Sequence, residues 1–490
     1  MPTTVSGSYP AVNSDSDATI NGLTVGRGAG AVSTNTAVGA SALNANTTGA
    51  SCTAVGADSL ALNTTGRNTA YGRYSLSLNT TGTLNTGLGD NSLYSNTTGG
   101  NNVAVGYQAL VFNTTASNNT AVGYQAAYSN VNQNNVTAIG FQSLYNNNQN
   151  TNTAVGAYSM YANTTGFYNA AVGNDVLRSN TTGAYNTALG VDALRSNTTA
   201  SQNTAVGYTA GYANTTGTFH TALGYQALYS NTTGNTNTAL GRNTLYSNTT
   251  GSSNTAVSNG ALSSNTTGDN NVAVGRDALS TNTTNTYNTA VGYQAGVNST
   301  GGSNTFIGAG ATTASGAGSA MTTGSNNVIL GAYTGNNGGL DIRTSNNHIV
   351  ISDGSGNPRF WIDNLAQFNA KGIYSLTSAV AANVYVDAGG YLYRSTSALK
   401  YKQDVRDLES IDINKFRPVR YKSKGSKDDQ TKDHFGIIAD EVDAAGIKEL
   451  VTYGAEGEVE GFQYERLTVV LLKAIQELKA EFDAYKATHP

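Results

Sequence analysis

The sequence is poor in charge, in cysteine and in long apolar runs, and each shortage excludes a class of protein. Charged residues make up 11% of the 490 residues, against about 25% in an average globular domain. The single cysteine, Cys52, excludes an internal disulfide framework and a multi-cysteine metal site. No stretch approaches the roughly 18 consecutive apolar residues of a membrane-spanning helix, and a formal net charge of -4 gives no nucleic-acid footprint. We therefore expect no membrane insertion, no nucleic-acid partner, no metal and no cofactor.

The few charges are unevenly distributed. Residues 397–490 hold 33 of the 56 charged residues, and the only lysine before that segment is Lys371. The first residues have neither a basic region nor an apolar region, so we expect no secretory signal peptide. Two physically different parts are therefore expected to join near residue 395.

Glycine, asparagine and threonine are abundant instead, and they are arranged in a repeat. The pentapeptide NTAVG and its variants recur every 17 residues, occasionally 16, with the glycine running from Gly39 to Gly308 and with Ser258 in one glycine position. The consensus is N-T-A-V-G-Y-Q-A-L-Y-S-N-T-T-G-x-x, in 17 units between residues 35 and about 318. A period of this kind is typical of a solenoid, in which each unit packs only on its neighbours.

Each unit has two short apolar pieces, T-A-V and A-L-Y, each followed by glycine or by an Asn-Thr-Thr-Gly corner. Pieces of this length suit strands, whereas a glycine in each half disfavours a helix. Glycine and asparagine at the corners supply positive φ at little steric cost. The sequence therefore predicts a mainly β protein whose shaft is a parallel β-solenoid, or β-roll, over residues 35–325.

Large apolar side chains are few in each unit, so a single solenoid would be weakly stabilised by burial. We expect several chains to associate along their apolar faces. From about residue 326 the repeat relaxes into alternating runs, which predict a transition region of longer strands over 326–396. That region ends in a hairpin within NVYVDAGGYLYRS, and Trp361 is expected to fill a core there.

Asn-Thr-Thr recurs at most units, for example at Asn46, Asn163 and Asn265. As a motif it is a glycosylation sequon. The alternative, which we favour because the step repeats at every unit, is a ladder of stacked asparagine amides.

Tyrosines in the repeat offer candidates for receptor contact. Tyr107, Tyr124, Tyr225 and Tyr293 follow the repeat glycine, and such aromatic side chains with a polar tip suit contact with a host surface glycan. The alternative is that each tyrosine covers the coil edge and supports the next one. A glycan-cleaving site needs two carboxylates close together, and the scattered acids of the tract do not provide a convincing pair.

The NTAVG repeat resembles the head repeats of trimeric autotransporter adhesins, and resembles still more the repeat tracts of phage tail fibres. The resemblance covers about residues 35–310 and implies a homotrimer. The number of three chains comes only from this resemblance, because the burial argument predicts association without fixing how many chains associate.

Four segments near the C-terminus carry a second resemblance: SALKYKQDV, FRPVRYK, HFGIIADEV and YERLTVVLLKAIQELKAEF. Together they are similar to the intramolecular chaperone of endosialidase-type phage fibres, the S74 peptidase family, over residues 397–490. That family uses a Ser–Lys pair to cleave its own chain before the serine. The resemblance implies Ser397 as nucleophile and Lys402 as base, with cleavage after Thr396.

A shifted register, Ser395 with Lys400, has the same spacing and stays open. His434 is a further candidate for an assisting role, with a surface or capping histidine as the alternative. At most, the chain is then a single-turnover autoprotease.

The last helix places Leu471, Ile475, Leu478, Phe482 and Tyr485 at steps of four and three, an a/d seam. We expect a three-stranded helical bundle in a trimer, and the alternative is a helix that packs on its own domain.

The combined prediction is a trimeric bacteriophage fibre or spike in the virion, made in the host cytoplasm. Residues 1–34 would attach it to other tail or virion proteins, and the shaft would contact the host receptor. A bacterial trimeric surface adhesin and a glycan-degrading tail spike are the alternatives.

Overall fold

The computed structural model describes residues 18–20, 23–309, 316–370, 384–386, 392–394, 405–424, 430–454 and 457–489. The chain divides into two compact units, Met1–Ser375 and Leu376–Pro490, which are treated separately below. Ser395, Thr396, Ser397, Lys400 and Lys402 lie outside the described residues. Among the helices of the described ranges, none combines the length and the apolar character needed to cross a membrane.

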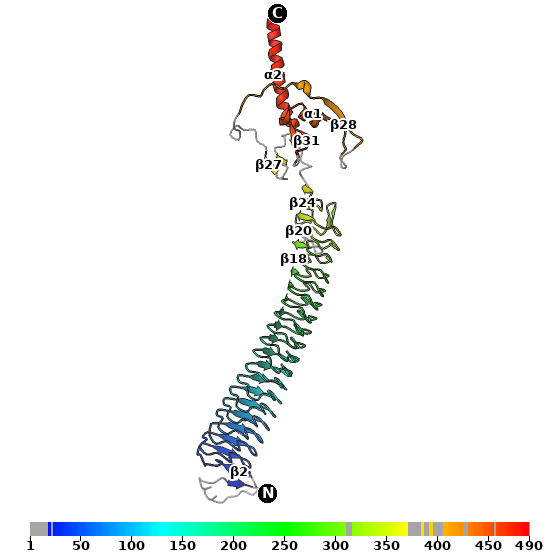
Figure 1. The fold of residues 1–490 in the computed structure, drawn as a ribbon. Helices are drawn as coiled ribbons and strands as arrows, with labels where there is room; N and C mark the ends of the chain where they lie inside the picture. The colour runs from blue at the N-terminus through cyan, green and yellow to red at the C-terminus, as the bar shows by residue number, and fades with distance from the viewer. Residues whose placement is uncertain are drawn as a thin grey trace. The chain divides into compact units, whose positions relative to one another are not determined.

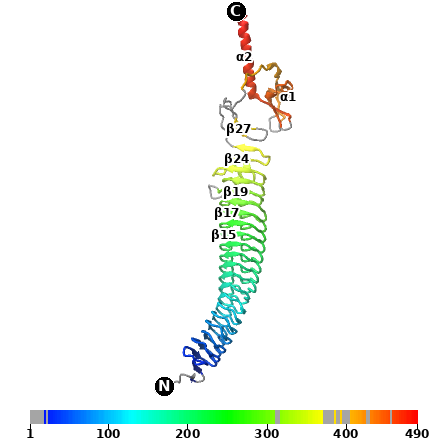
Figure 2. The same ribbon diagram turned by 60° about the vertical axis from the view of Figure 1, so that its left-hand side comes forward.

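The first unit is a parallel β-solenoid, as the repeat predicts. Strand β3 (Thr36–Val38) pairs in parallel with β4 (Thr53–Val55), and the pattern continues coil by coil to β20 (Val328–Leu330) and β23 (Ile349–Ser352). Figure 1 shows the coils stacked in chain order, and Figure 2 shows that this stack is gently curved. The strands in between are β5 (Thr69–Tyr71), β6 (Thr86–Leu88), β7 (Val103–Val105), β8 (Thr120–Val122), β9 (Thr137–Ile139), β10 (Thr153–Val155), β11 (Ala170–Val172), β12 (Thr187–Leu189), β13 (Thr204–Val206), β14 (Thr221–Leu223), β15 (Thr238–Leu240), β16 (Thr255–Val257), β17 (Val272–Val274), β18 (Thr289–Val291) and β19 (Thr305–Ile307).

The second apolar piece of each unit is not a strand, so that part of the prediction is wrong. In the coil that begins with β7, Gln108 and Leu110 have φ of 54° and 51°, and the segment is a run of turns. The Gln108 N–H donates to the Asp90 carbonyl of the previous coil, and the Leu110 N–H donates to the Ala126 carbonyl of the next coil, both at 3.0 Å. Left-handed conformations at non-glycine residues cost about 1–2 kcal/mol each. The hydrogen bonds to both neighbouring coils and the burial of Leu110 offset that cost.

The repeat glycine follows the strand at a place where only a very small residue fits. Gly123 has φ +136°, and a Cβ built on it would lie 2.3 Å from the carbonyl oxygen of Gly140 in the next coil. Glycine is therefore required by both the backbone conformation and the coil spacing. Ser258, the single exception, has φ 96°.

The core of each coil contains asparagine as well as alanine and leucine, and the predicted asparagine ladder is confirmed. The Asn180 side-chain amide donates to Asn163 Oδ1 at 2.8 Å and to the Gly183 carbonyl at 3.0 Å, and Asn180 is fully buried. Burial of these amides in the core rules out the sequon interpretation. The same side-chain bond links consecutive members of the set Asn46, Asn63, Asn79, Asn96, Asn113, Asn130, Asn147, Asn163, Asn180, Asn197, Asn214, Asn231, Asn248, Asn265 and Asn282.

A second ladder uses the asparagine that precedes each strand. The Asn119 backbone N–H donates to Asn102 Oδ1 at 3.0 Å, and Asn102 Nδ2 donates to the Ala116 carbonyl at 2.8 Å. Each such side chain therefore links its own coil to the next coil along the chain. A few coils carry another residue at this position, among them Val136 and His220.

Antiparallel strands close both ends of the parallel sheet. At one end β1 (Ala18–Ile20) pairs with β2 (Leu23–Gly26), which pairs with β3. At the other, β23 pairs with β24 (Pro358–Ile362), which pairs with β25 (Phe368–Ala370). Hairpins of this kind cover edges of a stack that would otherwise offer free backbone groups to other strands.

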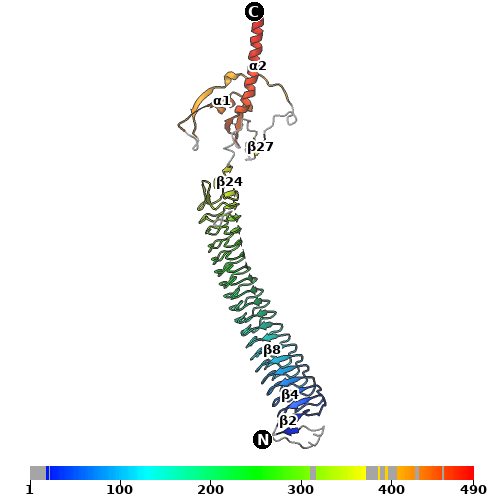
Figure 3. The same ribbon diagram turned by 180° about the vertical axis from the view of Figure 1, so that it is seen from behind.

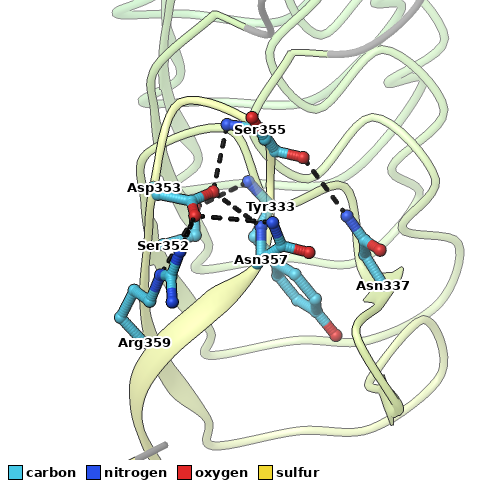
Figure 4. Close-up of polar contacts among 7 residues, drawn as sticks. All are labelled: Tyr333, Asn337, Ser352, Asp353, Ser355, Asn357 and Arg359. Atoms are coloured by element: carbon cyan, nitrogen blue, oxygen red, sulfur yellow. Dashed lines mark hydrogen bonds and ion pairs between the residues drawn. The ribbon is translucent and has the colours of Figure 1, made fainter. Parts of the chain in front are cut away.

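Trp361 is partly buried and packs against the solenoid core, in agreement with the sequence prediction. The turn before β24 is fixed by Asp353, whose carboxylate accepts the backbone N–H groups of Ser355 and Asn357 at 3.0 and 2.9 Å and the Arg359 guanidinium at 2.6 Å (Figure 4). The Asn357 backbone N–H and then the Arg359 side chain lower the pKa of Asp353 to about 2. The hydrogen bonds of the Asp353 carboxylate thus serve to hold the turn that leads into β24. A small hairpin of β21 (Asn336–Asn337) and β22 (Leu340–Asp341) lies before it in the chain.

The second unit mixes short strands with helices. Its elements are β26 (Val384–Val386), β27 (Leu392–Arg394), η2 (Ile413–Lys415), β28 (Pro418–Lys422), β29 (Asp433–Ile437), α1 (Ala439–Ala444), η3 (Lys448–Leu450), β30 (Val451–Tyr453), β31 (Val459–Phe462) and α2 (Tyr464–Thr488). The antiparallel pair β26–β27 confirms the hairpin predicted within NVYVDAGGYLYRS. A small core holds the unit together, formed by Phe416, Val442, Ile447, Leu450, Val451 and Val470. Figure 3 shows α2 extending away from α1.

Candidate functional site

Three of the four C-terminal motif segments meet in one place. The segments FRPVRYK and HFGIIADEV form the antiparallel pair β28–β29, in which Val419 lies opposite Gly436. The Arg417 guanidinium pairs with the Glu441 carboxylate of the second segment, and this contact lowers the pKa of Glu441. The third segment joins through Tyr464 at the start of α2, whose hydroxyl accepts the Ile437 N–H at 2.8 Å.

His434 lies on β29, and its ring stacks on that of Tyr421 with the centroids 5.6 Å apart. Its Nε2 atom is buried and has no hydrogen-bond partner among the described residues. The proposed Ser397–Lys402 pair and the shifted pair Ser395–Lys400 lie outside the described residues. The catalytic roles of all five residues therefore remain predictions.

The a/d seam of α2 is exposed. Val470 is the one buried residue of this helix, whereas Ile475 and Leu478 are 61% and 67% exposed. Packing within the described part of its own unit thus does not account for the seam. Leu471, Phe482 and Tyr485 are exposed as well.

A row of apolar side chains also runs along the outer face of the solenoid sheet. In each strand the middle residue is buried and the flanking residues point outward, as in β12, where Ala188 is buried and Leu189 is exposed. Because the strands stack in register, the third positions form one continuous row. Its most exposed members are Tyr71, Leu88, Ile139, Val172, Leu189, Leu223, Leu240, Val291, Ile307, Leu330 and Ile351. We call this surface the sheet row.

Among the predicted receptor tyrosines, the structure brings together only Tyr107 and Tyr124. Their rings stack at 5.4 Å with an interplanar angle of 17°. Tyr225 stacks instead on Tyr208 at 5.5 Å. The ring of Tyr293 lies 5.8 Å from the Arg276 guanidinium. Stacking along the coil axis supports the neighbouring coil, as the alternative interpretation proposed, and does not test receptor contact.

The two acids that are one repeat apart each have a cationic partner in their own coil. Asp175 pairs with Arg178 at 2.8 Å, and Asp192 pairs with Arg195 at 3.4 Å. Burial raises the pKa of Asp192. Since each carboxylate is paired with an arginine, this pair gives no support to a glycan-cleaving site.

Comparison with known families adds an independent finding for the C-terminal module. A family model described as peptidase S74, chaperone of endosialidase, matches residues 397–452. The match begins at Ser397 and includes the segments that form β28 and β29. No curated protein and no solved structure matches the chain. The chain thus combines a β-solenoid shaft with a C-terminal region that matches the endosialidase chaperone.

Proposed function

We propose that the protein is a homotrimeric fibre or spike of a bacteriophage virion, folded by its own C-terminal chaperone. The observation that carries this proposal is the endosialidase-chaperone match at 397–452, in a chain whose preceding part is a solenoid with a closing hairpin. Residues 1–34 would attach the fibre to other tail or virion proteins, and the shaft would contact a host surface glycan.

Two exposed apolar surfaces support assembly of several chains. The sheet row continues over the whole parallel sheet, and the α2 seam repeats at heptad spacing. Continuous apolar surfaces of this length are uncommon on monomers and mark protein contacts. In the proposed trimer, the sheet row packs against the other chains and the three α2 helices form a bundle.

A chaperone would set the register between chains, which the repeat alone leaves ambiguous. If one chain slips by a single coil, the sheet row still places apolar side chains against apolar side chains, so the error costs little locally. Registering the three chains at one end before the shaft closes removes that ambiguity. Deletion of 397–490 should therefore give insoluble or unassembled shaft, and soluble, stable trimers from this truncation would refute the proposal.

The α2 bundle can be tested without removing the module. Ile475→Glu with Leu478→Glu places charges in the seam and should reduce the assembled mass measured by light scattering. Gln476→Glu, which adds a charge at an exposed position on the side of the helix away from the seam, is the matched control. Equal trimer yield from both variants would exclude the bundle.

Self-cleavage is proposed to follow folding. The Ser397 hydroxyl oxygen attacks the Thr396 carbonyl carbon while the neutral Lys402 amine accepts the hydroxyl proton. The peptide C–N bond breaks, the nitrogen of Ser397 takes a proton, and water then hydrolyses the ester to leave a carboxylate on Thr396. Intact-mass spectrometry should find a fragment that begins at Ser397.

The two possible registers give different results. Ser397→Ala and Lys402→Ala should each abolish the fragment, whereas Ser395→Ala should leave it. Loss of cleavage only in Ser395→Ala and Lys400→Ala would assign the shifted register, and an uncleaved wild-type trimer would leave the module as a chaperone alone.

A further inference from the structure

Two rows of aromatic rings follow the shaft through the coils of β7 to β10, and the coils of β8 and β9 carry a ring of each row. The first row contains Tyr107, Tyr124 and Phe141, with ring centroids 5.4 and 5.1 Å apart. The second row contains Tyr128, Tyr145 and Tyr161, with centroids 4.8 and 5.2 Å apart. In the β8 and β9 coils the first-row ring follows the repeat glycine, and the second-row ring comes four residues later in the chain.

One tyrosine joins the rows at their end. Tyr158 contacts Phe141 at 5.2 Å and Tyr161 at 5.9 Å, and its ring is turned by about 70° relative to both. Tyr158 therefore links the two rows at one end.

A glutamine directly follows each first-row ring in the chain: Gln108, Gln125 and Gln142. Gln125 Nε2 donates to Gln108 Oε1 at 2.9 Å, and Gln142 Nε2 donates to Gln125 Oε1 at 2.8 Å. A carboxamide has two N–H donors and two acceptor lone pairs. Gln125 thus keeps one donor and one acceptor for another partner while the ladder holds its orientation. We call the two rows and these amides the aromatic strip.

The aromatic strip carries no charge. Between Asp90 and Asp175 the chain has no charged residue at all. The rings of Tyr107, Tyr124 and Phe141 are each more than 40% exposed. The surface therefore combines aromatic rings, phenol hydroxyls and amides that both donate and accept hydrogen bonds.

We propose that the aromatic strip binds an uncharged glycan chain lying along the shaft. Sugar hydroxyls both donate and accept, which matches amides and phenols, and the C–H faces of sugars pack on aromatic rings. An acidic glycan would find no cation there. The proposal rests on the proposed function, because it locates the host-glycan contact of the fibre and states the class of glycan.

A second aromatic region of the shaft lacks the amide ladder. Tyr208 stacks on Tyr225, and Tyr212, Tyr229 and Tyr246 form a neighbouring row. The residues between those rows are Thr209, Gln226 and Asn243, so a single glutamine stands where the aromatic strip has three. We therefore assign the site to the aromatic strip.

The test uses the full-length protein and conservative variants that keep the stacks. Gln125→Met removes the central amide, and Tyr107→Phe with Tyr124→Phe removes two hydroxyls. The matched control is Tyr168→Phe with Tyr185→Phe, another exposed stacked pair with centroids 5.4 Å apart. Circular dichroism melts and light scattering check that each variant folds and assembles as the wild type does.

Binding is measured on an array of neutral polysaccharides, including dextran, mannan and galactan, and of acidic ones, including alginate and polysialic acid. We expect a neutral glycan to bind and each variant of the strip to weaken it by about tenfold, the loss of roughly 1.4 kcal/mol. The control pair should leave binding unchanged.

Three results would overturn the assignment. Binding of acidic glycans only would refute the ligand class. If a neutral glycan binds all the strip variants as well as it binds the wild type, the binding site lies elsewhere, and the proposed fibre function still holds. Absence of glycan binding, together with loss of trimer mass in the strip variants, would show that the strip is a contact between chains, while trimer mass and cleavage would still report separately on the fibre proposal.

Discussion

Replacing His220 by asparagine should remove a weakness of the shaft at acid pH. His220 occupies the second ladder, where its backbone N–H donates to Asn203 Oδ1 at 2.9 Å. Its Nδ1 atom lies 3.3 Å from the Asn237 N–H and accepts from it, as the oxygen of an asparagine does elsewhere. The side chain is 3% exposed. A proton on Nδ1 would replace the acceptor by a second donor and break this rung.

The size of the effect follows from the pKa. Burial lowers the pKa of His220 from 6.5 to about 4. Above pH 6.5 both the folded and the unfolded chain are neutral at this site, so it has no effect on stability. As the pH falls from 6.5 to 4 the unfolded chain binds the proton and the folded chain does not, which destabilises the fold by about 3 kcal/mol per chain. Below pH 4 the loss levels off.

Hydrogen exchange read by mass spectrometry measures this locally, since a long repeat array need not unfold in one step. Peptides covering the β14 coil should lose protection in the wild type between pH 7 and pH 4.5 relative to His220→Asn at the same pH. Peptides from the β8 coil are the internal reference. An equal pH dependence of wild type and variant in the β14 coil would refute the assigned hydrogen-bond role of His220.

The remaining predictions concern the first asparagine ladder, the repeat glycine and the C-terminal module. Asn180→Ala removes the rungs to both neighbouring coils and leaves buried amides unpaired, so a loss of about 2–4 kcal/mol is expected in denaturant unfolding; an unchanged midpoint would contradict the buried ladder. Gly123→Ala brings a Cβ to 2.3 Å from the Gly140 oxygen, and should lower the melting temperature or abolish assembly, whereas wild-type melting would show that the coils can separate there. Glu441→Gln removes the charge that pairs with Arg417 and should lower module stability slightly at low salt and less at high salt, because the pair is exposed and screened. A loss of stability independent of salt would contradict an ionic contact.

Much of the shaft could be predicted because its strands follow a local rule repeated many times. The middle residue of T-A-V is buried and its neighbours face outward, as at Ala188 and Leu189, which is the alternation of any strand with one buried face. The stacking of equivalent residues then follows from the constant period. The ladder through Asn163 and Asn180 was predictable for the same reason, since identical residues must meet when coils repeat.

The A-L-Y turns were not predictable by the same rule. Leu110 is apolar and buried, which is equally consistent with a strand, and its positive φ is one that leucine disfavours in isolation. Hydrogen bonds to the coils on either side stabilise that conformation, and they exist only once several coils have stacked. The second asparagine ladder was not predicted for a related reason. Asn119 lies next to a strand, where asparagine also suits an ordinary turn.

In the C-terminal module the motifs predicted which segments matter but not how they meet. Arg417 and Glu441 are 24 residues apart in the chain, and no spacing rule brings them together. Their contact needs the β28–β29 hairpin to return the chain and α1 to follow it at once.

The polar core also bears on why a chaperone would be needed. Most coils place the same alanine, leucine and two asparagines against their neighbours. The buried contacts therefore stabilise stacking by nearly the same amount whichever two coils are adjacent. Register information is confined to the few positions that break the pattern, such as Cys52, Val136 and His220 in the second ladder. Because these rungs are buried inside each chain, they cannot distinguish one alignment between chains from another. In the proposed trimer, a separate module that aligns the chains at one end would supply the specificity that a core built from one repeated coil cannot.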